Sequence, residues 1–225
     1  KTISEGYLAY LICNFKADTI ANKNVRYALS YAINRKDLCD NILKDGSQPA
    51  TGFVPAQLCK SPSGKDFREE SGKYVDYDVK KAQEYLDAAK KELGTDTITV
   101  DLLYGTDESP MDTMAEYLQG SFSKLKGLKV NMVATVKKDR IYNREANGNF
   151  QVVCTRWGPD YADPTTYLNL ATTDNSNNYG KYTNAKYDAL MEQIQKESDL
   201  TKRWDLMIQA EKVMMEDMAY IPVFE

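Results

Sequence analysis

Short apolar or alternating runs along the chain predict five strands. They lie at residues 6–15, 98–104, 128–136, 150–156 and 219–225. Between them, apolar residues recur at spacings of three and four, which is typical of helices that bury one face. This spacing predicts helices over residues 24–33, 35–43, 78–93, 109–125 and 138–146, a short one after residue 163, and two long ones that begin at residues 184 and 201.

Residues with particular backbone roles stand at the ends of these predicted helices. Asn34 and Asp78 are suited to accept hydrogen bonds at a helix start, and Gly94 follows a helix where a left-handed residue is common. Pro110 is expected in the first turn of its helix, and Leu93 completes the buried stripe of residues 78–93. Residues 45–72 are rich in Gly, Pro and Ser and predict a long surface loop, a type of segment that often carries function.

The order of elements between residues 98 and 156 predicts the fold class. Strand, helix, strand, helix and strand follow one another, and crossovers of helix length join parallel strands. We therefore expect one α/β domain over residues 1–225, with helices packed on a largely parallel mixed sheet. Both ends of the chain resemble strands and carry no polar tail, which suggests a lobe cut from a longer protein at a hinge.

Composition excludes several classes of function. The 29 basic and 33 acidic residues give a net charge of −4 without a basic stripe, so we expect no nucleic-acid partner. The sequence contains no histidine, which excludes Ser-His-Asp and Cys-His catalysis and H-E-x-x-H metal sites within this chain. No run approaches the ~20 apolar residues that a membrane span requires. We predict no enzyme activity, no cofactor and no metal site.

The four cysteines do not form a C-x-x-C motif, which excludes a zinc knuckle by spacing. Cys13 and Cys154 fall within apolar strand patterns, where a cysteine packs as a small hydrophobic residue. Cys39 and Cys59 could pair, but spacing alone does not place their sulfur atoms close together. We predict four free thiols.

The best candidate site is the segment 156–164, Arg-Trp-Gly-Pro-Asp-Tyr-Ala-Asp-Pro, which follows the strand at 150–156. In open α/β sheets, ligands bind beyond the carboxyl ends of the strands. Asp163 directly precedes Pro164, an arrangement that indicates a helix cap. Asp160 has no such role: a turn that bonds its own backbone and a contact with a cationic ligand are equally consistent with its position.

Several blocks in this order resemble the peptide/nickel-type solute-binding proteins of ABC importers. The most extensive is Asn22-Lys-Asn-Val-Arg-Tyr-Ala-Leu-Ser-Tyr-Ala-Ile-Asn-Arg-Lys36. Each block alone is modest, but together they span nearly the whole chain. The others are residues 49–55, 77–86, 156–164, 182–188 and 219–222.

The resemblance implies one lobe of a type II periplasmic-binding-protein-like fold, which closes on its ligand by a hinge. In oligopeptide-binding members, the Asp of the W-x-x-D-Y motif holds the ammonium group of the peptide. That role would fall on Asp160, with Trp157, Gly158 and Tyr161 along the same wall. Some members place an Arg three residues before the Trp to bind the peptide carboxylate. Cys154 stands there instead, which puts charge-specific capture of a fixed peptide length in question.

The resemblance also implies partners and a location. We expect a small peptide ligand, a membrane permease reached through the parent protein, a monomer, and an extracytoplasmic position on a lipid-anchored cell surface or in the periplasm. Family members that carry nickel chelates, heme or oligosaccharides, and peptide or pheromone sensors, are alternatives. A hydrolase that uses Asp160 and Asp163 as a carboxylate pair fits less well, because glycosidase carboxylates generally come from separate elements.

Overall fold

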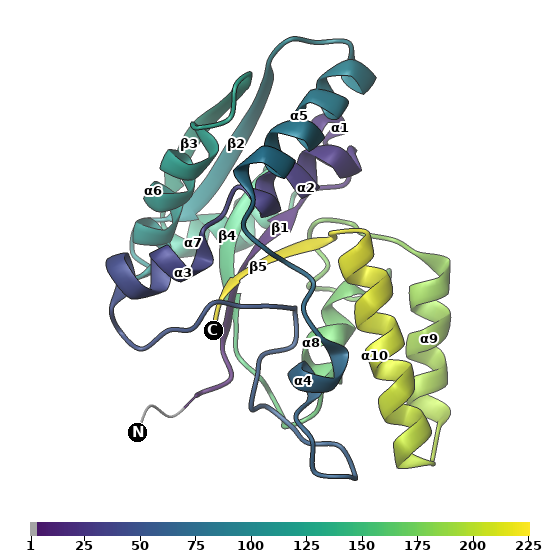
Figure 1. The fold of residues 1–225 in the computed structure, drawn as a ribbon. Helices are drawn as coiled ribbons and strands as arrows, with labels where there is room; N and C mark the ends of the chain where they lie inside the picture. The colour runs from purple at the N-terminus through teal and green to yellow at the C-terminus, as the bar shows by residue number, and fades with distance from the viewer. Residues whose placement is uncertain (1–3) are drawn as a thin grey trace.

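A five-stranded sheet of order β3-β2-β4-β1-β5 forms the centre of the structure, a computed structural model that describes residues 4–225 (Figure 1). β2 pairs in parallel with β3 and β4, whereas β1 lies antiparallel to both β4 and β5. Four strands therefore run in one direction and β1 runs against them, which confirms a largely parallel mixed sheet. The strands are β1 Leu8–Cys13, β2 Ile98–Gly105, β3 Leu128–Thr135, β4 Val152–Trp157 and β5 Tyr220–Phe224.

This topology places the carboxyl ends of β2, β3, β4 and β5 at the same edge as the amino end of β1. The pairing of Leu8 with Trp157 and of Ala9 with Phe224 brings the start of β1 beside the ends of its two neighbours. Because ligands of open α/β sheets bind beyond the carboxyl ends of strands, this edge is the first place to look for a site.

The helices lie in two groups (Figure 1). α6 packs against β2, β3 and β4, and α2 packs against α5, while α9, α4 and α8 pack against α10. None of the helices in residues 4–225 is both long and apolar enough to cross a membrane. The α-helices are α1 Asp18–Ala21, α2 Lys23–Tyr31, α3 Arg35–Asp37, α4 Phe67–Ser71, α5 Val79–Leu93, α6 Met111–Phe122, α7 Lys137–Asp139, α8 Thr165–Leu168, α9 Ala185–Lys196 and α10 Leu200–Glu216. Two π-helical segments, η1 Leu38–Leu43 and η2 Arg140–Glu145, and a 3₁₀ turn, η3 Asn169–Ala171, complete the chain.

Local side-chain bonds confirm several of the predicted helix ends. Asn34, Asp78 and Asn184 each accept a hydrogen bond from the backbone N–H three residues later, which satisfies a donor that the helix leaves free. Gly94 has a φ of 65°, the left-handed conformation expected of the residue that ends α5.

Three local predictions were wrong. Leu93 was assigned to the buried stripe of α5 but is 37% exposed, because it lies in the last turn of the helix. Pro110 precedes α6, which begins at Met111, so this proline is not in the first turn of the helix. The segment 45–72 is not only a surface loop, since it contains α4 and fully buries Phe53 and Phe67 in the core.

A buried ion pair fastens the segment 45–72 to α10. The Arg68 guanidinium donates to the Glu211 carboxylate, and both side chains are almost completely buried. Glu211 also accepts hydrogen bonds from the Phe53 N–H at 2.9 Å and the Ser71 hydroxyl at 3.0 Å. At its start, the segment lies along the free edge of β5, where the backbones of Gln48 and Glu225 exchange two hydrogen bonds.

All four cysteines are free in the structure, which confirms the prediction of free thiols. Cys13, Cys39 and Cys154 are buried, and Cys59 is partly exposed.

Candidate functional site

Two cavities lie at the edge where the carboxyl ends of the strands meet. The first has a volume of about 660 Å³ and is bounded by residues from β1, β4 and β5, the start of α6 and the segment 45–57. The second has a volume of about 340 Å³ and is bounded by β1, β4 and the residues that follow β2 and β3. Both volumes are within the usual range for ligand sites.

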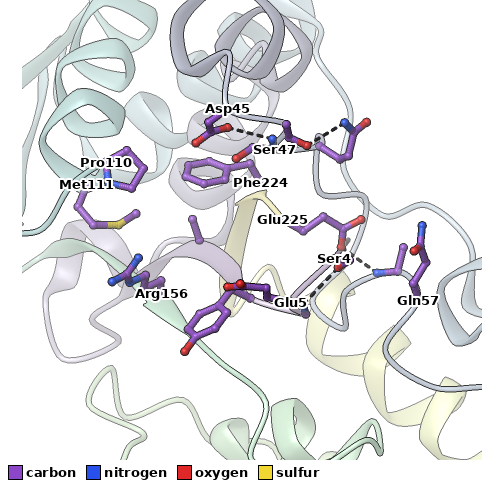
Figure 2. A pocket seen from close by; sticks show the side chains of 16 residues that line it. Ser4, Glu5, Asp45, Ser47, Gln57, Pro110, Met111, Arg156, Phe224 and Glu225 are labelled. Carbon is purple, nitrogen blue, oxygen red and sulfur yellow. Dashed lines mark hydrogen bonds between the residues drawn. The ribbon is translucent and has the colours of Figure 1, made fainter. Parts of the chain in front are cut away.

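Charged side chains stand around the first cavity. Figure 2 shows Arg156 and Met111 on one side and Glu225 and Gln57 on the other. The Glu225 carboxylate accepts a hydrogen bond from the backbone N–H of Ala56 at 2.8 Å. Burial raises the pKa of this carboxyl, and the bond from Ala56 acts in the opposite direction.

Tyr7 and Arg156 line both cavities, and we call them the Tyr7–Arg156 ridge. The guanidinium carbon of Arg156 lies 5.8 Å from the centroid of the Tyr7 ring, within the range of a cation–π contact. Gly158 lies directly against the same ring, because a Cβ atom at that position would come within 2.5 Å of Tyr7 Cε1. Tyr7 is 48% exposed, so the ridge offers an aromatic face to a ligand.

Trp157 is held at the end of β4 and lines the second cavity. Its indole N–H donates to the carbonyl oxygen of Thr166 at 3.2 Å, and its own carbonyl oxygen accepts from the Tyr167 hydroxyl at 3.0 Å. These bonds join the end of β4 to residues 166 and 167 and limit the positions that the indole can take.

Asp163 lies one residue before Pro164, the N-cap residue of α8, so its predicted position at the N-cap is wrong by one residue. Asp163 is also part of an ion pair that the sequence did not reveal. Its Oδ2 atom accepts from the backbone N–H of Thr165 at 3.1 Å, although α8 itself begins one residue later than predicted. Arg203 of α10 donates to both carboxylate oxygens, at 2.7 and 3.0 Å. Burial acts to raise the pKa of Asp163, but the bonds from Arg203 and Thr165 outweigh it and the pKa is lowered.

Asp160 differs from Asp163 in that its carboxylate has no partner among residues 4–225. The backbone N–H of Asp160 donates to the Thr166 hydroxyl at 2.9 Å, which holds the turn without using the carboxylate. The side chain is exposed and makes neither a hydrogen bond nor an ion pair with the described residues. A turn that bonds the Asp160 side chain to its own backbone is therefore not what the structure contains.

The remaining predicted residues are not all at the same surface. Tyr161 is 48% exposed, and its hydroxyl lies 3.1 Å from that of Thr165. Asp160 and Tyr161 lie outside the lining of both cavities, whereas Trp157 is part of it. Cys154 is fully buried within β4, so its side chain offers no surface at this edge and we leave it out of the site. A cysteine in an apolar strand run packs inward, as that pattern alone indicated.

A buried ionic cluster, which sequence reasoning missed, lines the second cavity. Arg140 donates to Glu108 through two nitrogens, at 2.6 and 2.9 Å, and also donates to Glu145. A third contact joins Arg140 to the Thr155 hydroxyl at 3.2 Å. Burial raises the pKa of Glu145 to about 7, against the opposing effect of Arg140. No spacing rule links residues 108 and 140, which are brought together only by the parallel pairing of β2 and β3.

Comparisons with known proteins agree with this architecture. Residues 1–179 match the model of the bacterial extracellular solute-binding proteins, family 5 Middle. A dipeptide-binding protein of Lactococcus lactis subsp. cremoris is 38% identical over 170 residues, which cover 75% of this chain and 30% of that protein. The chain thus spans less than half the length of the curated relatives it matches.

Two solved structures are similar over almost the whole chain. A crystal structure of a peptide-binding protein of a peptide ABC transporter has a TM-score of 0.92 and 41% identity, and covers 97% of this chain and 98% of that one. Listeria monocytogenes OppA bound to peptide has a TM-score of 0.90 and 34% identity, over 99% of this chain and 43% of that one. From its sequence and its fold, the chain belongs to family 5 of the bacterial extracellular solute-binding proteins.

Proposed function

We propose that this chain is one ligand-binding lobe of an extracellular protein that captures small peptides and delivers them to an ABC-type importer. The single observation that carries the proposal is the Asp160 carboxylate, which is exposed beyond the end of β4 and has no partner among residues 4–225. A peptide ammonium group would supply the missing donor in a charge-assisted hydrogen bond. The similar solved structures, a peptide-binding protein of a peptide ABC transporter and Listeria monocytogenes OppA bound to peptide, support a peptide over other cargo.

The arrangement supports binding rather than catalysis. A hydrolase would need two available carboxylates, but Arg203 and Thr165 already donate to the oxygens of the Asp163 carboxylate. The curated relatives are named as binding proteins, which agrees with this interpretation. The proposal therefore includes no catalytic residue, and it places the protein outside the cytoplasm, on a lipid anchor or in the periplasm.

The test uses the full-length protein that contains this lobe. Thermal unfolding is followed with peptides of two to eight residues, each with a free or an acetylated amino terminus. A ligand that binds only the native state adds about 2.7 kcal/mol of stability at a hundredfold excess over its Kd. We expect free peptides to raise the melting temperature, and we expect acetylation or Asp160→Asn to weaken binding by roughly ten- to a hundredfold.

Asp205→Asn is the matched control, because it makes the same change at an exposed position on α10. An equal response to free and acetylated peptides would keep the peptide as ligand but remove Asp160 from its recognition. If no peptide shifts the melting temperature, the proposed function is wrong.

A further inference from the structure

The second cavity combines aromatic walls with a carboxylate that is only partly satisfied. Tyr7, Tyr10, Trp157 and Tyr179 contribute the aromatic side chains, and Glu145 lies among the residues that line the same space. Aromatic faces attract cations, and a carboxylate attracts them more strongly. The lining therefore suits a positively charged group.

The hydrogen bonds of the ionic cluster leave one carboxylate oxygen free. Both oxygens of Glu108 accept from Arg140, whereas only Oε1 of Glu145 does so. Glu145 Oε2 accepts no hydrogen bond from any residue in the range 4–225, although the Glu145 side chain is only 3% exposed. It is also not one of the fully enclosed atoms without a partner, so it remains open to the cavity.

The charges around the cavity favour a cation at its base. When Glu145 is ionised, two carboxylates surround one guanidinium in the buried cluster, which then carries one net negative charge. Lys137 and Arg156 also line the cavity, but both side chains are exposed and water screens their charge. Buried charges are screened far less, so the net negative charge of the cluster would act more strongly on a group that enters the cavity than these two exposed cations do.

We propose that this cavity is a specificity pocket that takes a lysine or arginine side chain of the bound peptide, with Glu145 Oε2 as its acceptor. The inference rests on the proposed function, because it assigns one side chain of the peptide that this lobe would bind. The cavity shares Tyr7 and Arg156 with the first cavity, so a ligand that crosses the Tyr7–Arg156 ridge can reach both.

The titration of Glu145 gives a signature that a purely structural role would lack. Burial raises its pKa to about 7, so the carboxyl is ionised at pH 8 and largely neutral at pH 5.5. The other charged or titratable side chains that line the cavity are those of Glu108, Lys137, Arg140, Arg156, Tyr7, Tyr10 and Tyr179. Burial raises the pKa values of Tyr10 and Tyr179, which therefore stay neutral over this range.

The experiment measures the affinity of the full-length protein for matched tripeptides by calorimetry. Lys, Arg, norleucine or Glu is placed at each position in turn, with Ala at the other two. At pH 8 we expect Lys and Arg to bind about ten- to a hundredfold more tightly than norleucine at one position. This preference should fall to about onefold in Glu145→Gln, and in the unaltered protein at pH 5.5. Glu84→Gln, an exposed change on α5, should retain it.

Each alternative result has a distinct meaning. Equal affinity for Lys and norleucine at every position would overturn the cation pocket and leave peptide binding intact. An equal loss of affinity for all peptides in Glu145→Gln would also overturn it, because Glu145 would then act only on the structure. Failure of every peptide to bind would refute the proposed function and this inference with it. The pH arm needs no variant, so it decides the matter even if Glu145→Gln fails to fold.

Discussion

The buried Glu211 carboxylate should be one of the largest single contributors to the stability of this chain. It accepts from Arg68, from the Phe53 N–H and from the Ser71 hydroxyl, and its side chain is completely buried. We predict that Glu211→Gln strongly destabilises the protein. The substitution keeps the shape of the side chain but leaves the Arg68 guanidinium buried without a counter-charge, and Arg68 Nη2 already lacks a partner.

The size of the effect follows from this environment. Breaking a buried ion pair by removing one partner costs about 3–5 kcal/mol. Glutamine can still accept the bond from Phe53, so we expect the lower end, about 3 kcal/mol. For a domain of this size, 1 kcal/mol lowers the melting temperature by about 2–4 °C, which gives a loss of roughly 6–12 °C.

Thermal unfolding followed by circular dichroism measures this loss directly. Glu216→Gln is the matched control, because it makes the same change on the same helix in an exposed pair with Lys212 at 3.9 Å. Exposed pairs contribute about 0–1 kcal/mol, so this control should melt within roughly 4 °C of the unaltered protein. If Glu211→Gln also melts within about 2 °C of the unaltered protein, the assignment of Glu211 as the anchor of the segment 45–72 is wrong.

Two further predictions concern the edge of the sheet. In Gly158→Ala the new methyl group would meet the Tyr7 ring at 2.5 Å. Because Tyr7 is half exposed, its ring can move, so we expect little change in melting temperature but a severalfold loss of peptide affinity. Unchanged peptide affinity would contradict a role for the Tyr7–Arg156 ridge in binding. Burial raises the pKa of Glu145 from 4.5 to about 7. Its contribution to stability is therefore fully present below about pH 4.5 and lost as pH rises through about 7, so the melting temperature of the unaltered protein relative to Glu145→Gln should fall across that window. A difference in melting temperature between the two proteins that stays constant with pH would refute the raised pKa of Glu145.

Local rules predicted much of the fold because the contacts concerned join residues that are close together in the sequence. Asn34, Asp78 and Asn184 each bond a backbone N–H three residues away, so the residue type and the spacing are sufficient to locate a helix start. The alternation of strands and helices between residues 98 and 156 likewise predicted parallel strands, and β2 does pair in parallel with β3 and β4. Phe53 could not be placed in the core in this way, because its neighbours, Tyr10 and Tyr220, lie far away in the chain.

The candidate site was predicted only in part, for the same reason. The segment 156–164 begins with the last two residues of a central strand and continues beyond it. Asp163 accepts the first N–H of α8, as expected near a helix start, although Pro164 and not Asp163 is the N-cap residue. The partner of Asp163 on α10 and the Arg140 cluster depend on long-range packing, and neither has a signature in the sequence. Tyr7 was read as part of a strand, and only the antiparallel pairing of β1 with β4 brings it against Gly158.

The way this chain treats its buried carboxylates argues that the edge of the sheet is a binding surface. Glu108, Glu145 and Glu211 are the glutamates buried among residues 4–225. Glu108 and Glu211 have hydrogen bonds at both oxygens, as the cost of an unsatisfied buried charge demands. Glu145 keeps one oxygen free and faces the second cavity. A fold that bonds both oxygens of its other two buried glutamates, one of them in the same cavity, but leaves one oxygen of Glu145 open has left room for a cationic partner that the chain does not supply.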